Sequence, residues 1–185
     1  MINWGNFSGF FSTGVPSGVL YASLAMMAMI ILVVVFLGIK RLKSSRKIWR
    51  NVLGVLLAEY LFVVTCSTVV FRGVQSFKYA RLELTPFWTY EAVIKHTPGV
   101  SVWDIVLNMV LFMPLGFLIK LLSPSISFFK ILVFAILCSL FIETNQYIFE
   151  KGIAQFDDVM HNTIGAVIGW YFARMVMNLN TILQK

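Results

Sequence analysis

The chain has 185 residues, of which 59% are hydrophobic and 12% are charged, and its formal net charge is +7. About a quarter of the residues of a soluble globular domain are charged, whereas the apolar residues here form long blocks, so the composition excludes an ordinary soluble domain. The positive charge does not indicate nucleic-acid binding, because six of the fifteen Lys and Arg residues lie in one stretch, KRLKSSRKIWR (residues 40–50), between two apolar blocks.

Five apolar stretches of about 20 residues predict an all-α fold, a polytopic membrane helical bundle of about five transmembrane helices. Cytoplasmic loops concentrate Lys and Arg, so the basic stretch predicts a multi-pass protein of the cell membrane with its N-terminus outside and its C-terminus in the cytoplasm. We divide the chain into residues 1–51 (an external segment, the first helix and the basic loop) and a transmembrane domain, residues 52–185. The predicted spans are residues 20–39, 52–71, 102–122, 128–149 and 157–177.

The longest external connection, residues 72–101, contains PFWTYEAVIKHTPG. Pro86 suits the start of a helix, and the aromatic and aliphatic residues that follow alternate with Glu91, Lys95 and His96. This pattern predicts a short amphipathic helix at the membrane surface, held by interfacial Trp and Tyr. The alternative is an irregular loop with scattered aromatic side chains.

Polar residues inside the spans are the main indication of function, because a charged group near the middle of a bilayer costs about 2.5–3.5 kcal/mol and needs a partner. In the fifth span, Asp158, Asn162, Gly165 and Gly169 are spaced by four, three and four residues and share one helix face. The two glycines allow close approach of another helix, the third or the fourth span. Asp157 and Asp158 also suit the positive end of the helix dipole, which is the structural alternative.

The third and fourth spans carry polar pairs of their own. Glu143 and Gln146 are three residues apart and share a face. Glu143 is expected to be ionised with a cation or several hydrogen-bond donors as partners, to be neutral, or to extend toward the interface. Asn108 lies four residues after Asp104, and a hydrogen bond to a neighbouring helix is the favoured role of its amide. Pro114 should kink its helix.

Arg81, in the external connection, is the expected cation for Glu143, Asp157 and Asp158, because Arg pairs bidentately with a carboxylate or a phosphate. Glu59 lies apart, in the cytoplasmic half of the second span, without an evident partner. Under the predicted topology the other polar residues meet near the outer leaflet as a candidate ligand-binding cluster: Arg81, Asn108, Glu143, Gln146, Asp157, Asp158 and Asn162. A purely structural network of buried interhelical hydrogen bonds is the remaining alternative.

Four segments, RLELTPFWTY, NMVLFMPLGF, ETNQ and FDDVMHNTIGAVIG, occur in this order between apolar spans and resemble the VanZ family of small bacterial membrane proteins. The likeness covers about residues 72–175. Two positions depart from the family pattern: Glu83 stands where an Asn is common, and Lys151 and Gly152 stand where an Arg often precedes the acidic residues. Besides the polar positions Arg81, Asn108, Glu143, Gln146, Asp158 and Asn162, the resemblance covers the structural residues Pro86, Phe87, Pro114, Gly116, Gly165 and Gly169.

The resemblance implies a protein of the Gram-positive cell envelope that lowers susceptibility to teicoplanin-type and other lipid-bearing glycopeptide antibiotics, without remodelling of the peptidoglycan precursors. We expect membrane lipids as partners, with a lipid headgroup, a lipid-linked wall precursor or the lipoglycopeptide as ligand, and no nucleic acid, cofactor or metal. The alternative is a membrane enzyme that modifies a lipid-linked substrate with Glu143 or Asp158 as general acid or base. The sequence favours a non-enzymatic protein, because it has no Ser-His-acid set, HExxH motif or Cys/His metal spacing. It does not determine the oligomeric state.

Overall fold

The computed structural model describes residues 46–70 and 82–182. The predicted first span, residues 20–39, and Arg81 lie outside the described residues. The elements are α3 (Arg46–Thr65), the π-helical turn η1 (Cys66–Val70), β1 (Leu82–Glu83), α4 (Trp88–Ile94), α5 (Val102–Leu122), α6 (Phe128–Ile148), β2 (Ala154–Gln155) and α7 (Phe156–Ile182).

The described part of the chain is helical, as predicted, except for one parallel pair of two-residue strands that the sequence did not predict. In this pair Leu82 lies opposite Ala154 and Glu83 opposite Gln155. Strands of two residues are too short to show the alternating pattern by which a strand is recognised. The pair brings the segment before α4 next to the segment before α7.

Three described helical stretches are long and apolar enough to cross a membrane: Trp49–Val69, Val102–Leu122 and Phe128–Ile148. They correspond to the second, third and fourth predicted spans. The fifth predicted span coincides with most of α7, but α7 is not among the three helices that are apolar enough by composition. That α7 crosses the membrane stays a prediction.

Local capping explains where α5 and α6 begin. Ser101 and Asp104 form a reciprocal capping box at the start of α5, in which the Ser101 N–H donates to Asp104 Oδ2 at 2.6 Å. Ser127 caps α6, since its hydroxyl accepts a hydrogen bond from the Lys130 N–H. Asp104, four residues before Asn108, therefore has a capping role in its own helix.

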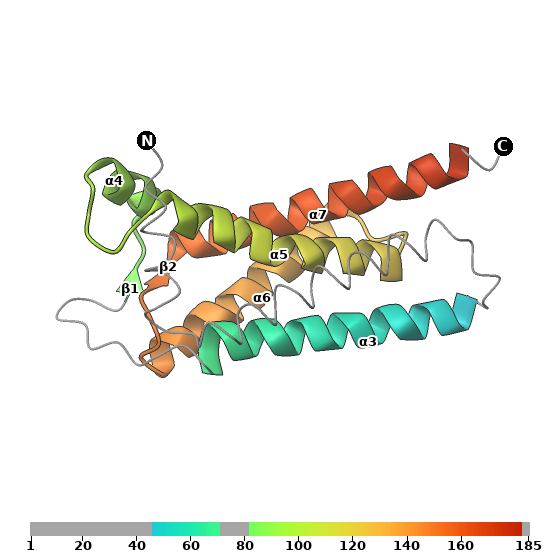
Figure 1. Cartoon of the computed structure of the whole chain (residues 1–185), viewed down its shortest axis with the longest axis horizontal. Coiled ribbons are helices and arrows are strands. Elements are labelled where there is room, and N and C mark those ends of the chain that lie inside the picture. Colours follow the sequence, from blue (N-terminus) through green and yellow to red (C-terminus); the bar gives the residue numbers. More distant parts are fainter. Residues whose placement is uncertain (1–45, 71–81, 183–185) are drawn as a thin grey trace.

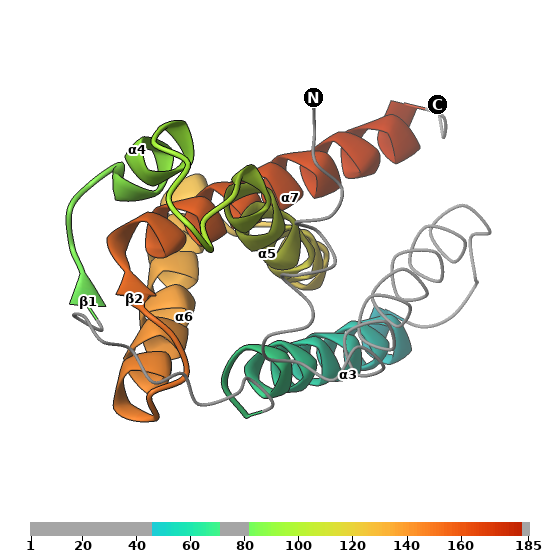
Figure 2. The same ribbon diagram turned by 60° about the vertical axis from the view of Figure 1, so that its left-hand side comes forward.

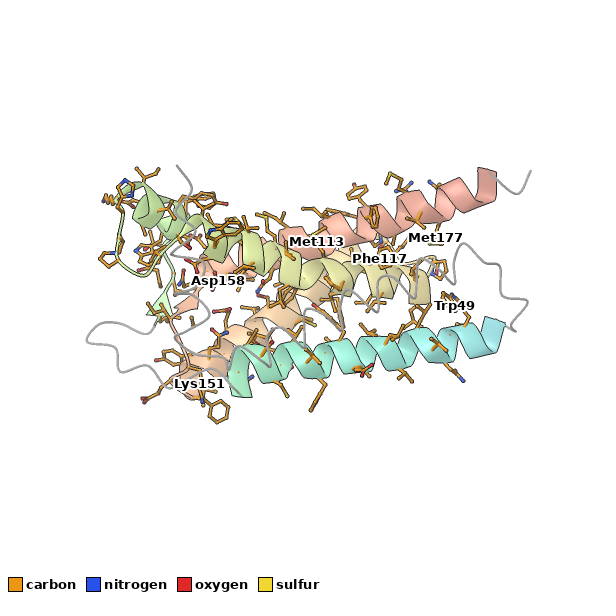
Figure 3. The ribbon with its side chains drawn as sticks, in the orientation of Figure 1. Trp49, Met113, Phe117, Lys151, Asp158 and Met177 are labelled. Carbon is orange, nitrogen blue, oxygen red and sulfur yellow. The ribbon has the colours of Figure 1, made fainter. Side chains whose placement is uncertain are left out.

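The long helices run alternately up and down and enclose one core (Figure 1). We call one end the polar end: it holds the C-terminal ends of α3 and α6, the N-terminal ends of α5 and α7, the strand pair and α4 (Figures 1 and 2). We call the opposite end the basic end. Asp158 lies at the polar end, and Trp49 and Met177 lie at the basic end (Figure 3). The core includes Leu53, Tyr60, Phe112, Leu115, Leu118, Ile131, Ala135, Ala166 and Trp170.

Helices α5 and α7 form the closest pair, and three glycines permit their contact. A Cβ atom added at Gly165 would lie 2.0 Å from the backbone oxygen of Met109, and one at Gly169 would lie 1.9 Å from that of Met113. In the reverse direction, a Cβ atom at Gly116 would lie 1.7 Å from the backbone oxygen of Ala166. The glycine face of the fifth span thus packs on the third span, which settles the choice that the sequence left open.

Pro114 lies inside α5, which continues through it from Val102 to Leu122. Proline lacks the N–H that would bind the carbonyl four residues earlier, so the backbone is under-bonded near this point. One residue along, the Leu111 carbonyl accepts a hydrogen bond of 2.6 Å from the hydroxyl of Tyr60 in α3. A side chain of the neighbouring helix thus binds α5 next to its proline.

The outer faces of the helices are apolar, which suits contact with lipid. On α6, for example, Leu137 and Phe141 are exposed. On α3, Glu59 is also exposed and lies on the same side as Val55 and Phe62, away from the core.

Candidate functional site

Hydrogen bonds between polar side chains connect three helices at the polar end. The Asn108 amide in α5 donates to Asp158 Oδ1 in α7 at 2.6 Å. One turn further along α7, the Asn162 amide donates to the Ser139 hydroxyl of α6 at 2.8 Å. The spacing of four residues between Asp158 and Asn162 places both on the face of α7 that meets its neighbours.

On α6, Glu143 and Gln146 are both buried and continue this polar region toward the end of the bundle. The Gln155 N–H, in β2, donates to Glu143 Oε2 at 3.0 Å. The Gln146 amide donates to the Thr68 carbonyl of η1 at 3.3 Å. Glu143 therefore binds the strand pair, and Gln146 binds the end of α3. We call these six residues the polar cluster: Asn108, Ser139, Glu143, Gln146, Asp158 and Asn162.

Asn162 has an unsatisfied acceptor. Its side chain is only 3% exposed, and its Oδ1 has no hydrogen-bond partner within residues 46–70 and 82–182. A buried polar atom without a partner costs about 1–3 kcal/mol. The polar cluster can therefore accept a hydrogen bond from a further donor.

Asp157 has different partners from its neighbour Asp158. Its side chain is 2% exposed, and its two oxygens accept hydrogen bonds from the Phe87 and Thr89 N–H groups, each at 2.7 Å. These N–H groups lie at the start of α4, where helical amides lack partners within the helix. Asp157 thus caps α4 from another helix, a role that the sequence did not predict.

His161 makes a second contact between α7 and α4. Its ring is fully buried, and Nε2 lies 3.0 Å from the Tyr90 hydroxyl, while no described residue hydrogen-bonds to Nδ1. Asp157 and His161 are one turn apart, so two consecutive turns of α7 hold α4 in place.

Helix α4 confirms that a short helix follows Pro86, while its amphipathic character stays a prediction. Thr89 and Ala92 are buried against the bundle, whereas Phe87 and Ile94 are exposed. Glu91 and Lys95 form an exposed ion pair on the outer side. Its position at a membrane surface stays a prediction.

The structure brings together five of the seven polar residues predicted as a cluster: Asn108, Glu143, Gln146, Asp158 and Asn162. Asp157 is directed to α4, and Arg81 lies outside the described residues. Sequence reasoning missed Ser139, which resembles any small residue of an apolar helix. It also missed the Thr68 carbonyl and the Gln155 N–H, because backbone groups are independent of residue type. Within the described ranges, no group of three His, Cys, Asp or Glu residues is placed to hold a metal ion.

Three described helices that are long and apolar enough to cross a membrane, packed around one core, define a multi-pass helical membrane protein. The family model described as VanZ/LLP1 matches residues 19–178, so the chain belongs to this family. The chain is 30% identical over 120 residues to Protein VanZ of Enterococcus faecium, and this match covers 62% of the chain and 68% of that protein. No solved structure matches the chain.

Proposed function

We propose that this protein lowers the susceptibility of a Gram-positive cell to teicoplanin-type and other lipid-bearing glycopeptide antibiotics, without catalysis, by binding a ligand at the polar cluster. The ligand is a lipid headgroup, a lipid-linked wall precursor or the antibiotic itself. Membership of the VanZ/LLP1 family and the similarity to Protein VanZ support the antibiotic context.

The observation that carries the binding proposal is the position of the polar cluster between apolar helices. Four of its residues are buried (Ser139, Glu143, Gln146 and Asn162), and Asn108 and Asp158 are partly buried. Asn108, Ser139 and Asp158 come from three different helices. If Asp158 served only to stabilise the start of its own helix, polar partners on two other helices would not be needed. Polar and ionisable side chains in such surroundings are costly and usually mark a site. The Oδ1 of Asn162, which has no partner among the described residues, supplies an acceptor for a donor of the ligand.

Arg81 supplies the cation of the proposed site. It immediately precedes β1, and β1 pairs with Ala154 and Gln155, whose N–H binds Glu143. This adjacency along the chain supports a guanidinium that reaches Glu143 and Asp158 on one side and a phosphate or carboxylate of the ligand on the other. With the polar end outside the cell, such a ligand would arrive from the outer leaflet.

Antibiotic susceptibility of a Gram-positive host tests the proposal. We expect Arg81→Ala, Glu143→Gln and Asp158→Asn to lose protection against teicoplanin at normal membrane abundance. Glu91→Gln is the matched control, because it makes the same chemical change at an exposed carboxylate of α4 outside the cluster. Unchanged protection in all three variants would refute a functional site built on the polar cluster and Arg81.

A binding measurement then separates the ligands. The purified protein is titrated with a fluorescent lipoglycopeptide, a lipid-linked wall precursor and phosphatidylglycerol in turn, and Asp158→Asn should weaken one titration selectively. Lipid extracts from cells with and without the protein test the catalytic alternative. A modified lipid that depends on Glu143 would favour an enzyme, and identical extracts would favour binding.

A further inference from the structure

At the basic end, two cations lie over one aromatic ring. The ring of Trp170, on α7, has the Lys120 Nζ at 5.1 Å and the Arg174 Cζ at 5.6 Å from its centroid. Lys120 comes from the last turn of α5, and Arg174 lies one turn after Trp170 on α7. Each distance lies within the range of a cation–π interaction.

The positive charge of Lys120 is held in place but is not neutralised. The side chain is only 7% exposed, and its ammonium donates to the Pro124 carbonyl at 2.5 Å and the Ile126 carbonyl at 3.5 Å. The Trp170 indole N–H donates to the same Ile126 carbonyl at 3.3 Å. Carbonyl groups satisfy the hydrogen bonds of an ammonium, but they carry no net negative charge to balance it.

No acidic side chain compensates this charge. Of the eight acidic residues of the chain, seven lie in or beside the elements of the polar end, and Glu59 lies in the middle of α3. Neither Lys120 nor Arg174 forms an ion pair with an acidic residue in residues 46–70 and 82–182, and Arg174 is exposed. The elements of this end contain six basic residues: Arg46, Lys47, Arg50, Lys120, Lys130 and Arg174.

The surface around Arg174 is apolar and exposed. Phe128, Tyr171 and Met175 are all exposed, and the Phe128 ring packs against the rings of both Trp170 and Tyr171. A soluble anion would use only the cations, whereas a phospholipid presents a phosphate together with acyl chains. This combination favours a lipid over free phosphate.

We propose that the basic end binds the headgroup phosphate of an anionic phospholipid. Arg174 contacts the phosphate, since its planar guanidinium matches two phosphate oxygens. The buried ammonium of Lys120 adds a fixed positive charge, Trp170 orients both cations, and Phe128 and Met175 contact the acyl chains. This site lies at the opposite end of the bundle from the polar cluster, so the inference does not rest on the proposed function.

The test uses the full-length protein in detergent, titrated with dioleoylphosphatidylglycerol or dioleoylphosphatidylcholine. Bound lipid is counted by native mass spectrometry. We expect phosphatidylglycerol to bind more tightly than phosphatidylcholine, and Arg174→Gln to weaken phosphatidylglycerol binding roughly fivefold, the effect of about one basic residue at an anionic surface. Arg174→Lys, which keeps the charge, should retain most of the affinity.

Lys130→Gln is the matched control, because it removes an exposed basic residue from the same end, away from Trp170. An equal loss in Lys130→Gln would show diffuse attraction and overturn the site. Equal affinity for phosphatidylcholine would also overturn it. If inorganic phosphate alone bound with the same dependence on Arg174, the ligand would be a soluble anion, and the lipid proposal would be wrong. The melting midpoint of each variant without lipid checks that the variant is folded. Because Arg174 is exposed, we expect its variants to melt at the same temperature as the wild type.

Discussion

The amide of Asn108 and the carboxylate of Asp158 face each other at 2.6 Å across the contact between α5 and α7. A hydrogen bond to a charged group contributes about 1.5–3 kcal/mol, more than one between neutral partners. This pair therefore has a measurable structural role, which has to be separated from its proposed role in ligand binding.

An exchange of the two residues makes that separation. Asp158→Asn and Asn108→Asp should each lower the melting midpoint in detergent, the second more strongly because it places two carboxylates together. The double variant restores an amide–carboxylate pair, so it should recover most of the stability. Protection against teicoplanin should stay low, because the carboxylate is now on α5. If protection returned together with stability, the pair would be structural only.

The contact between α5 and α7 predicts that two Gly→Ala variants will differ strongly in thermal stability. A Cβ atom at Gly165 would meet backbone, so Gly165→Ala must displace a helix and should destabilise the protein by about 1–3 kcal/mol. Gly54, in α3, has nothing within 4 Å of an added Cβ atom, so Gly54→Ala should be neutral or stabilising by up to about 1 kcal/mol. Thermal unfolding in detergent measures both, and similar midpoints for the two variants would contradict the packing described.

Asp157→Asn should loosen α4 while the bundle stays folded. A carboxylate accepts from both the Phe87 and Thr89 N–H groups, whereas an amide offers one oxygen and turns an NH₂ group toward the other donor. We expect faster hydrogen exchange in the peptide covering residues 85–95, with little change in α5. Glu91→Gln serves as the control because that carboxylate is exposed. If exchange in the same peptide were also faster in Glu91→Gln, the cause would be a general effect of charge.

Tyr60→Phe should lower stability by about 1 kcal/mol, the usual value for one buried hydrogen bond. The Tyr60 side chain is 2% exposed, and its hydroxyl binds the Leu111 carbonyl of α5, so its loss leaves that carbonyl without this donor. Tyr147 is 47% exposed, and Tyr147→Phe should change the melting midpoint little. If the two substitutions lowered the melting midpoint equally, the hydrogen bond of the Tyr60 hydroxyl would contribute no more to stability than an exposed hydroxyl does.

The helices could be predicted well because their signals are local. The apolar run of residues 102–122 is bounded by Ser101 and by the segment SPSIS, and α5 covers that run. Helical spacing also placed Asp158, Asn162 and Gly165 correctly on one face. Whether this face meets the third or the fourth span depends on the three-dimensional path of the chain, so the sequence left it open.

The partners in the site were harder to predict for a physical reason. Asp157 binds backbone N–H groups of α4, and Glu143 binds the N–H of Gln155. Every residue except proline carries such a donor, so no residue type marks the partner. The sequence could show that these carboxylates needed a cation or hydrogen-bond donors, but it could not show which backbone N–H groups would be the donors. The pairing with Arg81 stays a prediction, because Arg81 lies outside the described residues.

The glycines that join α5 and α7 also limit how the protein can move. Backbone enters the space left by Gly116 on one helix and by Gly165 and Gly169 on the other, so neither helix can slide or rotate past its neighbour without a collision. Helix α6 meets this pair through side chains such as Ser139, which can separate and re-form contacts at lower cost. We therefore expect α5 and α7 to stay fixed relative to each other, and α6 to be the helix that moves if a ligand enters the proposed site.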